Sequence, residues 1–421
     1  MEKMTIENVM LFNNETCSFS NSDITVEKGI IKKIEPNGNP NSNLFAVPGF
    51  INTHSHVAMS RFRGLLDDMD LNHFLEKTFK LDESRSEKDM YHSTLCGIYE
   101  MLNNGITSFF DLYYGEDVIY KACESMNIRS FLSWNTLDKQ FSTQKGEPLD
   151  NARNFIREHK GKNTIIYPSV GIQGVYVASE ETIKAANEIS EKENTLLHMH
   201  VSETRKEVYN CLEKTGKRPV EYLSDLEVLS NRFNAAHCVW LTTREIALLG
   251  KSQSNISWNS VSNFKLGTGG IPPVPELISA GANVTIGTDS NGSNNGLNLL
   301  ETAKLGSLSI KNQRWDASHI KAVESFNMLT KNGGRATGVN KLGTLVEGAP
   351  ADLNIIDSNH HSIQGNNPEN FINHLVYSMN TSAIRDTIVA GKYIKKGFKM
   401  SSELEDKYEE SLKILKEEFR I

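Results

Sequence analysis

Residues 48–56 read Pro48-Gly49-Phe50-Ile51-Asn52-Thr53-His54-Ser55-His56, a mostly apolar run that ends in two histidines. Such a run predicts a buried strand whose polar residues gather at its C-terminal end. On an extended strand, side chains two residues apart point the same way, so His54 and His56 can bind one metal ion together. The His-x-His pattern also arises by chance, and other strand ends must supply the remaining ligands.

From about Phe45 to Ala336, β-branched or aromatic runs alternate with longer amphipathic ones such as Glu87–Asn103 and Glu180–Lys192. This alternation is typical of a parallel sheet in the α/β class. Eight strands closing a (β/α)8 TIM barrel over residues 48–340 are predicted, at 47–56, 107–114, 129–135, 165–173, 195–203, 233–240, 255–263 and 284–290.

The two ends of the chain have a different pattern. Met4–Ile34 reads as short strands with turns at Asn13-Asn14 and Lys28-Gly29, and Gly343–Lys399 reads the same way. Gly and Pro punctuate these runs as they do in small β structures. We therefore expect residues 1–47 and 341–400 to form one small β-sandwich domain. Residues 401–421 are predicted to be a C-terminal helix docked on the surface, with apolar residues three and four apart.

Composition excludes several classes of partner. The net charge is -7 without a dense basic run, which argues against nucleic acid. No stretch approaches the roughly 20 apolar residues of a membrane span. The five cysteines form no CxxC pair, which argues against a disulfide framework and favours a cytoplasmic protein.

The fifth predicted strand ends in His198-Met199-His200-Val201-Ser202-Glu203. Only one of its histidines needs to reach an ion, and His200 lies nearer the C-terminal end, where barrel sites are built. His198 is then a packed neighbour. Glu203 falls where the strand gives way to a loop: it is either a solvated surface residue or, beside a metal-bound water, a proton shuttle.

Two further strand ends carry polar residues. The sixth ends in Ala235-Ala236-His237-Cys238, where a lone histidine is commonly a satisfied core residue. The eighth ends at Asp289, and a carboxylate closing an apolar strand is costly to bury unless it meets a cation or donors. Three histidines with one carboxylate, and a position left for water, make up a catalytic divalent metal site.

Taken in order, these motifs resemble the amidohydrolase superfamily and, within it, the deaminase group. The resemblance extends to Val261–Gly267 and Ser293-Asn294-Asn295 and covers nearly the whole chain. It is strongest to the methylthioadenosine and S-adenosylhomocysteine deaminases and to the triazine hydrolases. It implies a distorted eight-fold barrel with a small β domain made from both chain ends.

The resemblance also implies residue roles. The metal ligands would be His54, His56, His200 and Asp289, and the catalytic residues Glu203, His237 and Asp289. Zinc is the default ion, although iron, manganese or cobalt fits the same ligands. Since no lysine ends the predicted fourth strand, Ile165–Gln173, one ion is expected rather than two.

The activity implied is hydrolytic deamination of an aminated heterocycle, with an adenosine derivative such as methylthioadenosine, S-adenosylhomocysteine or deoxyadenosine as substrate. A divalent cation lowers the pKa of bound water to near 7. By the resemblance, Asp289 and His237 accept its proton, and Glu203 protonates the ring nitrogen before ammonia leaves. A homodimer or higher homo-oligomer that acts on a small molecule is expected.

Several positions depart from the family pattern. Ile172-Gln173 replaces a Pro-His pair, Trp134-Asn135 replaces an Arg-Gly pair, and Trp258 stands where strand seven usually carries a histidine near Asn259. The ribose-binding Glu falls on Asp82. The substrate contacts are therefore predicted at Asp82, Gln173, Glu203 and His237. Another purine, a pterin, a pyrimidine or a triazine-type ring that loses halide or alkylamine stays open, as does a catalytically idle metal-binding homologue.

Overall fold

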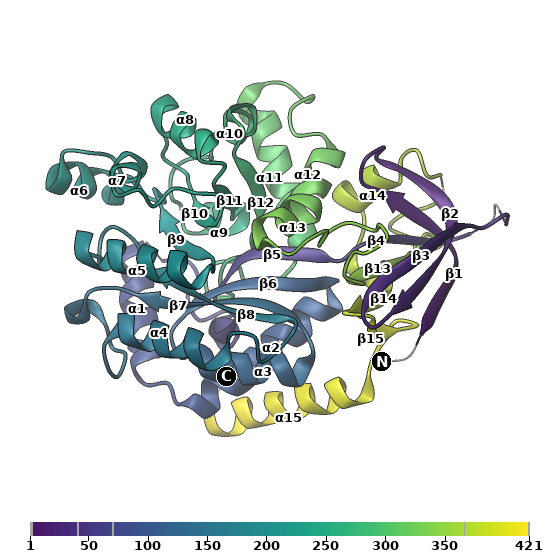
Figure 1. Cartoon of the computed structure of the whole chain (residues 1–421), viewed down its shortest axis with the longest axis horizontal. Coiled ribbons are helices and arrows are strands. Elements are labelled where there is room, and N and C mark those ends of the chain that lie inside the picture. The colour runs from purple at the N-terminus through teal and green to yellow at the C-terminus, as the bar shows by residue number, and fades with distance from the viewer. Residues whose placement is uncertain (1–2, 40–41, 70, 366, 420–421) are drawn as a thin grey trace.

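The computed structural model describes residues 3–39, 42–69, 71–365 and 367–419. At its centre eight parallel strands form one sheet in chain order (Figure 1). They are β5 (Phe50–Ser55), β6 (Ile106–Tyr113), β7 (Arg129–Thr136), β8 (Ile166–Ile172), β9 (Leu197–Val201), β10 (Phe233–His237), β11 (Asn255–Trp258) and β12 (Asn283–Ile286). A bridge between Ser55 and Asp289 closes the sheet, so the predicted eight-stranded barrel is confirmed.

Small polar side chains fill part of the barrel interior. The hydroxyl of Thr53 on β5 lies 2.8 Å from that of Ser257 and 2.7 Å from that of Thr285. The amide of Asn234 on β10 donates to the Thr53 carbonyl at 2.9 Å. These hydrogen bonds across the barrel offset most of the cost of burying the hydroxyls, whereas Oδ1 of Asn234 has no partner among the described residues.

Helices surround the barrel. Ser179, Thr204 and Thr242 each begin a helix by accepting a hydrogen bond from a backbone N–H of its first turn. The helices between the barrel strands and after β12 are α1 (Leu71–Glu83), α2 (Glu87–Asn103), α3 (Glu116–Met126), α4 (Pro148–His159), α5 (Glu180–Glu193), α6 (Arg205–Thr215), α7 (Pro219–Asp225), α8 (Thr243–Lys251), α9 (Ser260–Lys265), α10 (Val274–Ala280), α11 (Leu299–Arg314), α12 (Ala322–Leu329) and α13 (Lys331–Thr337). Short 3-10 turns lie at η1 (Val57–Phe62) and η2 (Lys139–Phe141).

Several predicted strands were too long, and at two of them the extra residues lie in another element. The seventh was expected over 255–263, but β11 ends at Trp258 and the chain turns into α9. The first was expected from Val47, but Val47 and Pro48 belong to a strand of the other sheet. The chain leaves that sheet at Gly49, where a Cβ atom would lie 2.1 Å from the Thr107 hydroxyl oxygen, so only glycine fits this close approach.

The two ends of the chain form a second sheet, as predicted. Its order is β16 (Lys399–Met400), β15 (Lys392–Lys396), β14 (Ile384–Val389), β13 (Leu353–Asp357), β4 (Leu44–Pro48), β1 (Met4–Asn13), β2 (Ser18–Glu27) and β3 (Ile30–Pro36). Hydrogen bonds join all of them into one continuous sheet, and a shared core includes Ile24 from the first part of the chain and Leu353 from the last. The later segment was expected as strands and turns only, but it also contains η3 (Thr381–Ala383) and α14 (Phe371–Tyr377), whose apolar residues recur at helical spacing.

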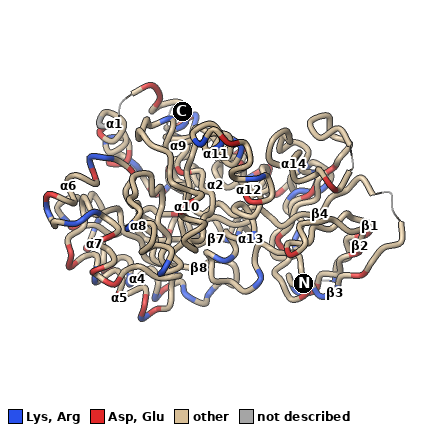
Figure 2. Tube along the Cα trace, turned by 90° about the horizontal axis from the view of Figure 1, so that it is seen from above, with Lys and Arg blue, Asp and Glu red and all other residues tan. Residues whose placement is uncertain are grey.

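A buried ion pair joins the two sheets. Arg129 at the start of β7 donates two hydrogen bonds to Asp352, at 2.6 and 3.1 Å. The final helix, α15 (Ser402–Phe419), runs along α2 (Figure 1), and Tyr408 stacks on Tyr99 with ring centroids 4.1 Å apart. Acidic and basic residues are interspersed over the outer helices (Figure 2). No helix among the described residues is long and apolar enough to cross a membrane.

Candidate active site

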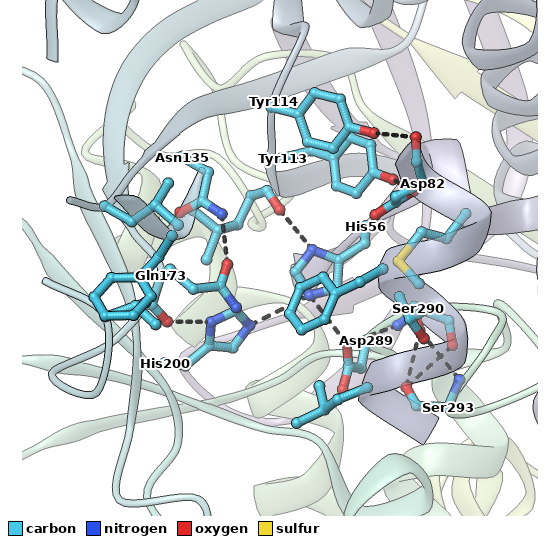
Figure 3. A pocket seen from close by; sticks show the side chains of 18 of the residues that line it. His56, Asp82, Tyr113, Tyr114, Asn135, Gln173, His200, Asp289, Ser290 and Ser293 are labelled. Atoms are coloured by element: carbon cyan, nitrogen blue, oxygen red, sulfur yellow. Dashed lines mark hydrogen bonds and ion pairs between the residues drawn. The ribbon is translucent and has the colours of Figure 1, made fainter. Parts of the chain in front are cut away.

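Four of the predicted site residues, His54, His56, His200 and Asp289, meet at the C-terminal mouth of the barrel. Figure 3 shows three of them, His56, His200 and Asp289. The Nε2 atoms of His54 and His56 lie 3.5 and 3.3 Å from Asp289 Oδ1. The Nε2 atoms of His56 and His200 lie 3.3 Å apart. Residues more than 200 positions apart in the sequence are thus brought within ligand distance of a common centre.

The outer ring nitrogens orient these imidazoles. Nδ1 of His54 lies 2.9 Å from Nε2 of His198. Nδ1 of His56 donates to the Leu112 carbonyl at 2.5 Å, and Nδ1 of His200 donates to the Gln173 carbonyl at 2.7 Å. With every Nδ1 occupied, all three rings present Nε2 to the centre, which is the arrangement that second-sphere partners impose on metal-binding histidines.

The charge states of these groups fit a divalent cation. Burial lowers the pKa of His54 well below its usual value and that of His200 to about 3, so both rings are neutral. Burial alone would raise the pKa of Asp289, but the surrounding imidazoles, His54 first and then His56 and His237, together hold the pKa well below its usual value. Among the described residues, the buried Nε2 of His54 has no hydrogen-bond partner, as expected of a ligand atom.

His237 and Asp289 share an unusual backbone. Their φ angles are 77° and 64°, in the left-handed region that residues other than glycine rarely adopt. With the backbone in this conformation at both positions, Nε2 of His237 lies 3.9 Å from Asp289 Oδ2. Asn263 donates to Nδ1 of His237 at 2.9 Å. Ser262 donates to the same Asp289 oxygen at 2.6 Å. Strained positions of this kind are often found at active sites, where surrounding contacts hold them.

Glu203 lies beside this group at the end of β9. Its carboxylate is 3.9 Å from the His237 ring, and burial, together with the charge of Asp289, raises its pKa to about 8. Glu207 on α6 braces the turn by accepting the backbone N–H groups of Ser202 and Glu203, both at 2.8 Å. A carboxyl that keeps its proton near neutral pH, at a fixed position in a pocket, can act as a general acid.

A pocket of about 190 Å³ opens above these residues, and its described lining includes all four predicted substrate contacts, Asp82, Gln173, Glu203 and His237. The remaining wall is largely apolar, from Phe74 and Phe79 on α1 to Leu137 and Phe141 near η2. Figure 3 shows Asp82 with Tyr113 and Tyr114 on one side and Asn135 with Gln173 on the other. The cavity therefore has a polar floor and an apolar rim, as small-molecule sites commonly do.

Some site residues were missed from sequence, and one expectation changes. His198 was expected as a packed neighbour; it is fully buried, and its Nε2 also lies 2.9 Å from Nδ1 of His54, a contact the sequence did not indicate. Trp258 lies against α11, where a Cβ on Gly306 would meet its indole at 2.7 Å, so it forms no part of the pocket wall. Asn259 takes the place near His237, at 3.3 Å. The helical spacing of the apolar residues in α1 could have indicated an amphipathic helix over the barrel. Nothing in the sequence of α1 indicated which strand end this helix covers.

Comparisons with known proteins agree on one family. The model of the amidohydrolase family matches residues 45–394. A 5'-deoxyadenosine deaminase from Methanocaldococcus jannaschii is 34% identical over 398 residues, which cover 92% of this chain and 94% of that protein.

Two solved structures share the fold. An adenosine deaminase from Xanthomonas campestris with bound zinc has a TM-score of 0.90 at 22% identity, covering 98% of both chains. An atrazine chlorohydrolase from Arthrobacter aurescens complexed with zinc has a TM-score of 0.88 at 19% identity, covering 98% of this chain and 99% of that one.

Proposed function

The chain belongs to the amidohydrolase family, and from this premise we propose that it deaminates an adenosine derivative by hydrolysis and releases ammonia. It is a hydrolase of carbon–nitrogen bonds in cyclic amidines. One observation carries the assignment: three Nε2 atoms and the Asp289 carboxylate converge beside the Glu203 carboxyl at the floor of a single pocket.

His54, His56, His200 and Asp289 would hold one divalent ion. The zinc in the adenosine deaminase and the atrazine chlorohydrolase described above supports zinc, since nitrogen ligands with one carboxylate also suit it. When bound, such an ion lowers the pKa of a water molecule from about 16 to near 7 and supplies a nucleophile at neutral pH. Iron, manganese and cobalt are the other outcomes of a metal analysis.

The protein's own groups then move the protons. Asp289 Oδ2 accepts a proton from the attacking water. His237, whose Nδ1 accepts from Asn263, keeps its proton on Nε2 and can donate it towards the same oxygen. This differs from the expected role of His237 as an acceptor. Glu203 donates its proton to the ring nitrogen next to the amino-bearing carbon, which stabilises the tetrahedral centre. The proton held by Asp289 then passes to the amino group, which leaves as ammonia, and the hydroxyl of the tetrahedral centre returns a proton to Glu203 as the ring carbonyl forms.

The pocket lining supports an uncharged nucleoside. Among the described residues that line it there is no Lys or Arg, whereas Asp82, Glu203 and Asp289 are acidic. A phosphate or carboxylate on the substrate would be desolvated there without a counter-charge from these side chains, which is unfavourable. The name of the relative from M. jannaschii points the same way, because 5'-deoxyadenosine carries no charged 5' group.

Two finer points complete the proposal. Five free cysteines support a cytoplasmic location, since disulfides are rare there. A homo-oligomer remains a prediction from the family resemblance.

An ammonia-release assay with metal analysis tests the function. The panel contains 5'-deoxyadenosine, methylthioadenosine, adenosine, S-adenosylhomocysteine, AMP, guanine, a pterin and a triazine. We expect turnover of the uncharged adenosine derivatives, with AMP at least about tenfold worse in kcat/KM. Turnover of only the triazine or only the pterin would replace the adenosine derivative as the assigned substrate class. Failure of the metal-loaded protein on the whole panel would favour the idle homologue and refute the proposal.

A further inference from the structure

Arg85 is a buried cation directly behind the pocket wall. It lies in the turn between α1 and α2, and its side chain is 0% exposed. Its guanidinium donates to the Ala58 carbonyl at 2.6 Å and to Asp89 at 3.2 Å. It also donates to the Tyr113 hydroxyl at 3.1 Å and lies 3.7 Å from Asp82 Oδ1. A buried guanidinium is kept only where such partners compensate its desolvation.

The Tyr113 hydroxyl transmits this contact to the pocket. Because its oxygen accepts from Arg85, its single proton is directed to Asp82 Oδ1, to which it donates a short hydrogen bond. Asp82 and Tyr113 line the pocket, whereas Arg85 does not. The hydrogen bond from Tyr113 and the ion pair with Arg85 both fall on Oδ1 of Asp82, which leaves Oδ2 for a donor on the substrate.

Electrostatics point to the same role. Burial raises the pKa of Asp82, and Arg85 is the strongest influence that opposes the rise. Without the guanidinium the carboxyl would tend to keep its proton, and a charge-assisted acceptor would be replaced by a weaker neutral group.

We propose that Arg85 is a positioning residue for substrate binding: through Tyr113 it turns the carboxylate of Asp82, where the family resemblance implies a ribose contact, so that Oδ2 accepts hydrogen bonds from the vicinal hydroxyl pair. The proposal rests on the proposed function, because it takes a ribonucleoside as the substrate. Arg85 acts through Asp82 and Tyr113 and touches no reacting atom.

Arg61 offers a matched control. It is an arginine on η1 that also donates to Asp89, at 2.7 Å, but it has no contact with Asp82 or Tyr113 among the described residues. Arg61→Gln removes a cation from the same acidic partner without disturbing the pocket wall.

The experiment compares adenosine with 2',3'-dideoxyadenosine. Steady-state kinetics and bound metal are measured for the wild type, Arg85→Gln, Arg85→Lys, Tyr113→Phe, Asp82→Ala and Arg61→Gln. In the wild type, loss of the hydroxyl pair should lower kcat/KM at least about tenfold, the equivalent of one hydrogen bond to a charged group. In Arg85→Gln and Asp82→Ala this preference should collapse towards one, mainly through the KM of adenosine, with metal content unchanged.

The remaining variants separate positioning from folding. Arg85→Lys and Tyr113→Phe should each retain part of the preference, and Arg61→Gln all of it. Equal losses on both nucleosides in Arg85→Gln would overturn the proposal, as would a wild type that does not discriminate between them. If Arg85→Gln fails to fold, full retention of the preference in both Tyr113→Phe and Asp82→Ala overturns it. A wild type inactive on both nucleosides would instead refute the proposed function.

Discussion

Replacing His198 by phenylalanine tests whether the metal centre depends on a residue behind it. His198 is completely buried, and its Nε2 lies 2.9 Å from Nδ1 of His54. Since Nε2 of His54 faces the centre, its proton sits on Nδ1 and is donated to His198. Phenylalanine keeps a ring in this space, next to Phe110 at 6.1 Å between centroids, but removes the acceptor.

The loss can be estimated from that one hydrogen bond. A buried N–H without a partner costs about 1–3 kcal/mol, which corresponds to about a 5- to 150-fold weaker metal affinity if the cost falls on the oriented, metal-bound state. Removing the second-sphere partner of a ligand histidine typically weakens metal binding about 10- to 100-fold. We therefore expect His198→Phe to bind the metal about 10- to 100-fold more weakly than the wild type.

A competition titration against a chromophoric chelator measures the affinity directly. His198→Gln is the control, because its side-chain oxygen can accept the proton of His54, and it should bind metal more tightly than His198→Phe. Thermal unfolding with and without metal separates binding from packing. If His198→Phe binds metal as tightly as the wild type, or destabilises the metal-free and metal-loaded protein equally, His198 is a core residue only and the reasoning is refuted.

Four further predictions concern the ligands, the acid and the ion pair between the sheets. His200→Ala should lose both bound metal and activity, as measured by metal analysis and ammonia release; full metal content would remove His200 from the ligand set. Glu203→Gln should keep the ion and lower kcat about 10²- to 10⁴-fold. Because the protonated form of Glu203 is the donor and its pKa is raised to about 8, wild-type kcat/KM should fall as pH rises through that pKa. The midpoint should lie at or below pH 8, because a bound cation lowers it, and a profile flat to pH 9.5 would contradict the assignment. Arg129→Met leaves Asp352 buried without its partner and should lower the free energy of unfolding by about 3–5 kcal/mol in urea titrations; a change below 1 kcal/mol would show that the ion pair is dispensable.

The barrel and the groups at its mouth could be predicted from sequence because both leave local signals. Each strand is a short apolar run, and His54, His200 and Asp289 interrupt such runs at their C-terminal ends, where parallel strands open onto a common face. The limits of the strands were less certain. The residues after Trp258 suit either a strand or a short helix. Only the closed barrel shows that they form the helix α9.

Tertiary structure alone decided the residues that hold the site in place. Arg85 and Glu207 belong to no motif, and His198, although it stands two residues before His200, gave no sign of its partner. Their roles follow from contacts such as the one between His54 and His198, 144 positions apart. A buried polar group must find a partner, but the partner can come from any part of the chain. The sequence by itself determined which groups could do the chemistry. Packing determined which atoms face the centre, because orientation depends on neighbours that only the folded chain brings together.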